Sequence, residues 1–432
     1  MSRSGQPLLR VEGLKKHYPI TQGVLNKEVG RARAVDEISF EIRRGETFGI
    51  VGESGCGKST AATSLIRLEE PTDGAVLFDG DDIMKYDTQQ LREFRREVQL
   101  IFQDPDSSFD PRMNIGDAVA EPLIAQGMTD KQRRREIVAD LLERVGLSAE
   151  DMKRYPHEFS GGQKQRIGLA RALTVNPKLL VADEPVSALD VSVQSEILRL
   201  INDFQESFGL SLLIISHDLG VVREVCDRVA VMYLGEFVEV GPTAELFADP
   251  KHPYTRALLS AIPTPDPTKR GLGVELTGSV PDPSNPPDGC RFHTRCPEVI
   301  PPEGIDLDQS VWRNVLQFRK EVEAESIDLE SIVEIGVLDA GDQYGDSDDP
   351  TPEGIDPRDL KRWVRNEYEI PERLDDEIAE TAVEKALDHV IAKEYEPAIR
   401  TLSDVFTTVC EIEDPALIGD GNQHVAACHL NE

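Results

Sequence analysis

The stretch Gly52–Thr60 constrains the fold of this chain more than any other part of its sequence. It fits the pattern G-x-x-x-x-G-K-[ST] and lies between a β-type run at Thr47–Val51 and a helix-compatible run at Ala61–Leu68. In this strand–loop–helix context, glycines let backbone N–H groups turn toward a phosphate, and the helix N-terminus adds partial positive charge. Lys58 is then placed to reach the outer phosphates, and the Ser59 hydroxyl to bind Mg²⁺. The residues of the predicted nucleotide-binding loop are Gly52, Glu53, Ser54, Gly55, Cys56, Gly57, Lys58, Ser59 and Thr60.

The charge of the chain is strongly negative and unevenly spread. The formal net charge is −33, and residues 301–432 carry 34 Asp and Glu against 11 Lys and Arg. This balance argues against nucleic acid as a partner, because phosphate backbones bind basic surfaces. The favoured interpretation is a solvated surface adapted to high salt, where screening removes the self-repulsion of the charges. The alternative is an acidic tail with a partner of its own.

Length and hydropathy predict a cytoplasmic chain of about two domains. The 432 residues are enough for two cores. No apolar run approaches the roughly 20 residues that span a bilayer, and the N-terminus lacks a signal-peptide pattern. We therefore expect a chain that reaches a membrane only by binding a membrane protein.

Strand and helix patterns alternate around the loop. We predict an edge strand at Leu8–Lys15, and a largely helical segment over residues 114–158. Ser160 is the predicted N-cap of a helix that runs to about Thr174, and the two glycines after it leave N–H groups open to an anion. Further strands are predicted at Ala34–Ile42, Ala75–Asp79, Val98–Phe102, Lys178–Ala182 and Leu210–Ile215. The fully apolar strands among them predict a parallel sheet that is covered on both faces and binds ligands at its carboxyl edge.

Two of the apolar strands end in polar residues that suit phosphate chemistry. Asp183 and Glu184 end the first, and His217 follows the second. Asp183 can coordinate Mg²⁺, and Glu184 can act as a base or as an orienting group for an attacking water. The plainer readings are a solvated Asp-Glu pair and a structural histidine.

These motifs occur in an order that resembles the nucleotide-binding subunit of ABC transporters. After the loop come Gln103, then Ser-Gly-Gly-Gln at 160–163, Asp183-Glu184, Ser-Ala-Leu-Asp at 187–190, and His217. The resemblance covers roughly residues 8–245. It implies an α/β fold of the P-loop NTPase class: a RecA-like core, an antiparallel β subdomain and a helical subdomain at about 104–160.

The resemblance also implies roles for individual residues, with ATP as substrate and Mg²⁺ as cofactor. Glu184, His217 and Gln103 would be catalytic, and Ser59, Gln103 and Asp183 would hold Mg²⁺. Tyr18 would stack on adenine, with a core aromatic as the alternative reading. The remaining nucleotide-binding residues would be Ser160, Gly161, Gly162, Gln163 and Asp190. In the family the Ser160–Gln163 signature faces the phosphate loop of a second subunit, so that two ATP molecules lie between two subunits. Phe159 stands where the family usually has Leu.

The chain beyond residue 245 resembles the C-terminal extension of ATPases that drive dipeptide, oligopeptide and nickel importers. The resemblance rests on Ala248–Leu259, a proline-rich stretch at 263–287, and Gly289–Pro297. Such importers use a pair of ATPases. The sequence of Lys16–Ile20 and that of the phosphate loop resemble the second ATPase of the pair.

This subfamily implies partners and a location. The partners would be two transmembrane permeases, a second ATP-binding subunit in a heterodimer and an extracellular solute-binding protein, with no nucleic acid. The chain would act peripherally at the cytoplasmic face of the membrane and power peptide import. Import of nickel or oligosaccharides is the alternative, and a soluble ABC ATPase of DNA repair or translation is a rival of another class.

Four cysteines fall in the extension. Cys290, Cys296, Cys410 and Cys428 remain after Cys56 and Cys226 are taken as buried thiols. Disulfides do not suit an intracellular chain, and the spacing lacks the C-x-x-C pair of zinc ribbons. Four thiolates suit a [4Fe–4S] cluster, which relatives of this extension carry. Structural zinc and four ordinary thiols are the alternatives.

A long insert separates the second cysteine from the third. The family usually has a short loop there, whereas this chain has 113 residues between Cys296 and Cys410. The insert is acidic at Asp342–Asp349 and has two or three helix patterns, notably Pro371–Lys393. We predict an ATP-binding domain at 1–245 and an extension at 246–432 that contains a helical subdomain at about 300–405. A salt-adapted spacer and a regulatory module are both open as its role.

Overall fold

The computed structural model describes residues 6–23, 27–104, 108–187, 189–262, 278–340, 352–419 and 423–431. By its internal contacts the chain forms two compact units. The first unit comprises Met1–Glu275, Ser279–Pro286 and Ala416–Asn431, and the second consists mainly of Pro287–Pro415. The predicted functional boundary at residue 245 stays a prediction. The acidic run Asp342–Asp349 lies outside the described residues, as does the part of the proline-rich stretch at 263–277.

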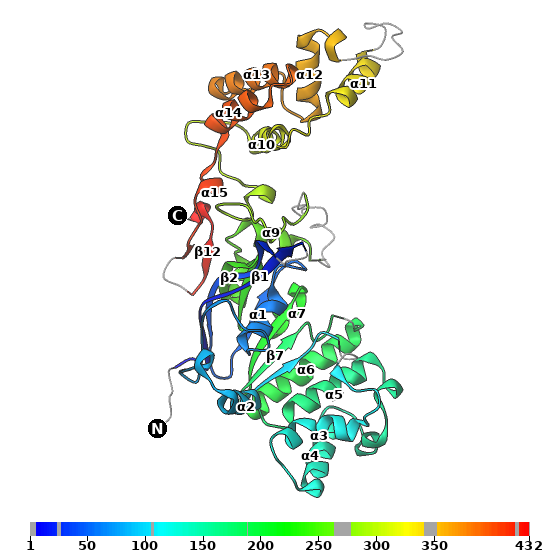
Figure 1. Ribbon diagram of the computed structural model, residues 1–432. Helices are drawn as coiled ribbons and strands as arrows, with labels where there is room; N and C mark the ends of the chain where they lie inside the picture. The colour runs from blue at the N-terminus through cyan, green and yellow to red at the C-terminus, as the bar shows by residue number, and fades with distance from the viewer. Residues whose placement is uncertain are drawn as a thin grey trace. The chain divides into compact units, whose positions relative to one another are not determined.

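The first unit is built on an eight-stranded sheet (Figure 1). Five neighbouring strands, β9, β3, β8, β7 and β6, run parallel and end at the edge strand β6, and β10, β12 and β11 continue the sheet on the other side by antiparallel pairing. The strands in spatial order are β11 (Leu417–Ile418), β12 (Val425–Ala427), β10 (Glu236–Pro242), β9 (Arg228–Tyr233), β3 (Thr47–Val51), β8 (Ser211–Ser216), β7 (Leu179–Asp183) and β6 (Val98–Ile101). All five residues of β3 and all six of β8 are buried, as the predicted two-sided cover of a parallel sheet requires.

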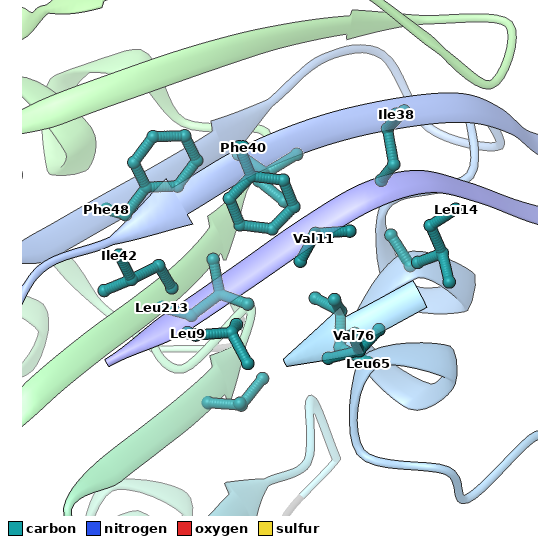
Figure 2. Close-up of a cluster of buried hydrophobic side chains, with 14 of the residues drawn as sticks. Leu9, Val11, Leu14, Ile38, Phe40, Ile42, Phe48, Leu65, Val76 and Leu213 are labelled. Atoms are coloured by element: carbon teal, nitrogen blue, oxygen red, sulfur yellow. The ribbon is translucent and has the colours of Figure 1, made fainter. Parts of the chain in front are cut away.

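A second, antiparallel sheet packs on the same core. Its order is β2 (Lys27–Ile42), β1 (Leu9–Gln22), β4 (Asp73–Phe78) and β5 (Asp81–Asp82). The prediction of an edge strand at Leu8–Lys15 is wrong, because β1 pairs with both β2 and β4. Figure 2 shows that Leu9, Val11 and Leu14 of β1 point into the apolar cluster that holds this sheet against the main one. Within it the rings of Phe40 and Phe48 stack at 5.0 Å between centroids.

Helices follow the strands of the first unit. α3 packs against both α4 and α5 (Figure 1), and α3 and α4 lie in the segment 114–158 for which the sequence predicts helices. The helices are α1 (Lys58–Leu65), α2 (Thr88–Glu97), α3 (Ile115–Ala125), α4 (Lys131–Arg144), α5 (Gly161–Leu173), α6 (Val191–Phe208), α7 (Leu219–Val225), α8 (Thr243–Ala248) and α9 (Pro253–Ser260).

The second unit is helical and has a core of its own. Its helices are α10 (Gln309–Glu323), α11 (Leu329–Ala340), α12 (Pro357–Glu367), α13 (Glu377–Ile391), α14 (Tyr395–Phe406) and the short α15 (Val409–Ile412). Trp312, Phe318 and Phe406 are fully buried there, and the Trp312 indole N–H donates to the Val299 carbonyl. The described part of the insert thus has more helices than the two or three expected. Within the described ranges no helix has the length and apolarity that a membrane span requires.

Candidate functional site

The Gly52–Thr60 loop connects β3 to α1, and two of its glycines are required by close contacts. A Cβ on Gly57, whose φ is 106°, would lie 1.9 Å from the Ala34 carbonyl oxygen. A Cβ on Gly52 would lie 2.2 Å from the Met232 carbonyl oxygen. Because backbone cannot yield at either point, larger residues are excluded. The strand–loop–helix context that the sequence predicts is therefore present.

The Lys58 side chain folds back over this loop. It is only 5% exposed, and its ammonium donates to the carbonyl oxygens of Gly52 and Glu53, each at 2.8 Å. Lys58 also begins α1, so a buried positive charge lies at the N-terminus of a helix. Both features favour an anion at this place.

Ser59 joins the loop to the end of β7. Its hydroxyl donates to Asp183 Oδ1 at 3.1 Å, over a sequence separation of 124 residues. Burial raises the pKa of Asp183 and the Glu184 carboxylate adds to the increase, while the Ser59 hydrogen bond and Lys58 oppose it. A buried carboxylate beside a second one is costly as an anion. The hydroxyl and carboxylate oxygens are ligands that Mg²⁺ prefers, so the donor set fits this ion.

Glu184 is held by the other two predicted catalytic residues. Gln103 Nε2 donates to Glu184 Oε2 at 2.7 Å, and His217 Nδ1 lies 2.9 Å from Glu184 Oε1. The residue adopts a left-handed backbone with φ 47°, while its N–H donates to the Ile215 carbonyl of β8. Such backbone conformations in non-glycine residues cost free energy and concentrate at functional sites. The structure thus brings Glu184, Gln103 and His217 together, next to Asp183.

The Ser160–Gln163 signature forms the cap of α5. Ser160 and Gln163 make reciprocal hydrogen bonds between side chain and backbone, of 3.0 and 3.4 Å, which complete a capping box. Gly162 lies against Val193, since a Cβ there would come within 2.5 Å of a Val193 methyl. Asp190 caps the helix that carries Val193, accepting from its N–H at 3.1 Å. The signature and Asp190 are therefore adjacent.

Tyr18 lies in β1 and is 36% exposed. Its hydroxyl donates to the Glu69 carboxylate, and the Lys16 ammonium lies 4.9 Å from the centre of its ring. Burial and the Glu69 hydrogen bond raise the pKa of Tyr18, while the Thr60 side chain lowers it. Tyr18 is thus an accessible ring close to the last residue of the phosphate loop.

The predicted four-cysteine site is not assembled. Across the described ranges, no three or more His, Cys, Asp or Glu side chains are arranged to hold a metal ion. The second unit does bring Cys290 and Cys410 close, because the Cys290 N–H donates to the Cys410 carbonyl at 2.9 Å. Cys290 and Cys296 also pack against the apolar cluster that includes Cys410, whereas Cys428 belongs to the first unit.

The sequence motifs do not predict one contact of the phosphate loop. The backbone N–H of Glu53 donates to the hydroxyl of Tyr254 at 2.9 Å. Tyr254 is fully buried, and it lies in the Ala248–Leu259 segment that identified only a subfamily. The available signal was a single tyrosine in the short helix Pro253–Ser260, and this signal does not reveal a partner 201 residues away.

Comparison with known proteins places this geometry in a family. Residues 35–187 match the family model "ABC transporter", and residues 238–301 match "Oligopeptide/dipeptide transporter, C-terminal region". Residues 309–423 match "Domain of unknown function (DUF8228)". This third match covers most of the insert and extends beyond Cys410.

Curated relatives agree with the first two matches. The probable peptide ABC transporter ATP-binding protein y4tS of Sinorhizobium fredii is 53% identical, over 68% of this chain and 83% of the relative. The oligopeptide transport ATP-binding protein AppF of Bacillus subtilis is 50% identical, over 68% of this chain and 91% of the relative. The dipeptide transport ATP-binding protein DppF of Haemophilus influenzae is 48% identical, over 68% and 90%. This chain belongs to the family of ATP-binding subunits of ABC transporters of the oligopeptide and dipeptide type.

Proposed function

We propose that this chain hydrolyses MgATP at the Gly52–Thr60 loop to drive peptide import. The observation that carries the proposal is the contact of Ser59 with Asp183 directly beside Glu184, which Gln103 and His217 hold. Peptides as cargo are supported by the named roles of the relatives and by the family match over residues 238–301. Nickel or oligosaccharides are the alternative cargo. A soluble ABC ATPase of DNA repair or translation is disfavoured, since it leaves that match unexplained.

The site residues divide the chemistry among them. Lys58 leaves the carbonyls of Gly52 and Glu53 and turns to the β- and γ-phosphates, which attract its charge more strongly. Ser59, Asp183 and Gln103 would hold Mg²⁺, which would neutralise charge on the phosphate oxygens. Tyr18 offers its ring to the adenine.

Glu184 then prepares the attacking water. Its carboxylate orients the water and accepts a proton from it, while the water oxygen bonds to the γ-phosphorus and the bond from that phosphorus to the oxygen of ADP breaks. His217 fixes the direction of the carboxylate and contacts the γ-phosphate.

A complete site takes two subunits in this proposal. The signature Ser160, Gly161, Gly162 and Gln163, with Asp190, serves the phosphate loop of the second subunit, which we infer to be the paired ATPase of a heterodimer. We therefore expect the purified chain to hydrolyse ATP slowly, with a rate per subunit that rises with protein concentration and on addition of its partners. The measurement is steady-state phosphate release over a hundredfold range of concentration. A high rate that does not depend on concentration in a monomeric preparation would contradict this arrangement.

Two transmembrane permeases complete the complex, at the cytoplasmic face of the membrane, with an extracellular solute-binding protein to deliver cargo. A cavity of about 240 Å³ between β6 and the helices α3 and α5 supports a docking place for a permease. It is lined by Phe102, which is 47% exposed, and by Phe109, Pro122 and Arg171. Gln103, which follows Phe102, would connect this surface to Glu184.

We also propose that Cys290, Cys296, Cys410 and Cys428 bind a [4Fe–4S] cluster, although their side chains do not form a metal site as placed. The proposal is supported by the contact of the first and third cysteine segments. A Cβ on Gly289 would lie 2.6 Å from the Cys410 carbonyl oxygen, so glycine is required there. Protein purified without oxygen is expected to be brown and to contain about four iron and four sulfide per chain. Stoichiometric zinc without iron would replace the cluster by a zinc site, and the lack of both metals would leave four ordinary thiols.

The acidic composition supports a surface adapted to high salt. The second unit packs a core of its own, as a folded subdomain requires. We keep both roles as proposals: a salt-adapted spacer and a regulatory module.

A further inference from the structure

The phosphate loop is held from behind by a chain of buried polar contacts that ends at the C-terminal segment. It starts at Glu53, whose backbone N–H donates to the Tyr254 hydroxyl. In the structure Lys58 holds the carbonyl of the same residue. Once Lys58 turns to the phosphates, as proposed above, Tyr254 continues to hold Glu53. The Tyr254 contact therefore matters most in the nucleotide-bound state.

Tyr254 owes its place to the way α9 begins. The ring packs edge-on against Tyr233 of β9, at 4.8 Å between centroids. The Tyr254 N–H donates to Nδ1 of His252, the N-cap of α9, at 3.0 Å. Burial lowers the pKa of His252 to about 3, and Arg256 adds to the decrease. His252 therefore stays neutral at physiological pH, with Nδ1 as an acceptor.

The start of α9 is fixed in turn by Glu239 of β10, which is completely buried. Its two carboxylate oxygens accept from the N–H groups of Lys251 and His252, each at 2.9 Å. A buried carboxylate needs several donors to offset the loss of hydration. The next donor comes from the far end of the chain.

That donor is His424, whose Nε2 lies 2.6 Å from Glu239 Oε1. His424 is 4% exposed and directly precedes β12, which pairs with β10 so that Ala426 faces Glu239. His424 directly follows the matched range 309–423, so the whole insert separates it in sequence from the other residues of this contact series. The segment Ala416–Asn431 accordingly groups with the first unit.

We propose that Tyr254 and His424 are positioning residues for MgATP, which act on the phosphate loop through His252 and Glu239. The inference rests on the proposed role of that loop. Tyr254→Phe removes the acceptor for the Glu53 N–H but keeps the ring. His424→Leu removes a donor to Glu239, whereas His424→Gln keeps an N–H that can reach the carboxylate.

The test is a titration of the full-length chain with MgATP, together with kcat at saturating ATP. Tyr254→Phe and His424→Leu are each expected to raise Kd about five- to tenfold with kcat within about twofold of wild type, and His424→Gln is expected to restore most of the affinity. The double variant should raise Kd by less than the product of the single effects, because both act through one chain of contacts. Matched controls in the second unit are Tyr368→Phe and His389→Leu, which should bind as wild type does.

Several results would overturn the inference. One such result is a Kd for Tyr254→Phe within twofold of wild type. Another is that His424→Gln binds MgATP as weakly as His424→Leu. If His424→Leu does not fold, Tyr254→Phe decides alone. Lys58→Ala in the same titration separates the two proposals: if it too binds normally, the phosphate loop itself is misassigned, whereas lost binding with a normal Tyr254→Phe sinks only the positioning role.

Discussion

Replacing Glu184 with glutamine is expected to lower kcat by about 10²–10⁴-fold while MgATP binding is retained. The glutamine amide has nearly the same shape, so the contacts to Gln103 and His217 can reform and the loop is untouched. The amide has no basic carboxylate, however, and the attacking water loses the group that accepts its proton. The measurement is steady-state ATP hydrolysis in the assembled transporter, with Kd taken from a separate titration.

The matched control for this change is Glu206→Gln, which makes the same chemical replacement at an exposed position of α6. It should leave both kcat and Kd unchanged. Hydrolysis at the wild-type rate in Glu184→Gln would remove Glu184 from the reaction.

Replacing Lys58 with alanine is expected to weaken MgATP binding by about 30- to 150-fold, as the loss of charge-assisted hydrogen bonds worth about 2–3 kcal/mol implies. Lys58 is buried, and it is the positive charge that the loop itself contributes. Its loss leaves the loop to hold the phosphates with backbone N–H groups and the helix N-terminus alone, without a charged side chain of its own. The same titration measures the effect.

Lys85→Ala is the control for that change, since Lys85 is an exposed lysine paired with Asp82, and its removal should not alter Kd. Equal affinities in Lys58→Ala and wild type would show that the nucleotide binds elsewhere.

The sequence predicts the core of the fold because local patterns there coincide with tertiary structure. β3, β7 and β8 are short apolar runs bounded by turn residues. A strand that is buried on both faces must consist almost entirely of apolar residues. In the phosphate loop, Gly52 and Gly57 are required because a Cβ at either position would clash with a backbone carbonyl oxygen. For these elements the residue types alone predict whether a position is buried and how its backbone runs.

Elsewhere the outcome depends on partners that are distant along the chain. β1 has an ordinary alternating pattern, and only its pairing with β4 as well as β2 makes it an inner strand. Glu239 and His424 are 185 residues apart, and neither lies in a recognisable motif. The left-handed backbone of Glu184 depends on the hydrogen bond that its N–H makes to β8. No local signal encodes such contacts, because register and long-range pairing decide them.

The cysteines are a second case in which the sequence does not determine the arrangement of distant residues. Their count and the resemblance of the extension suggested a metal site, yet ligand geometry depends on how residues more than 100 positions apart are oriented. The Gly289 contact explains how Cys290 and Cys410 come together, but it does not direct their side chains toward one metal.

The central claim, that this chain powers peptide import, is tested most directly by the uptake of a labelled oligopeptide in cells. The native gene is replaced by the Lys58→Ala variant, with Lys85→Ala as the control. The account predicts that peptide uptake is lost in Lys58→Ala and normal in Lys85→Ala, while uptake of nickel and oligosaccharides is unaffected in both. Normal peptide uptake in Lys58→Ala, or a loss confined to nickel or oligosaccharide uptake, would contradict it.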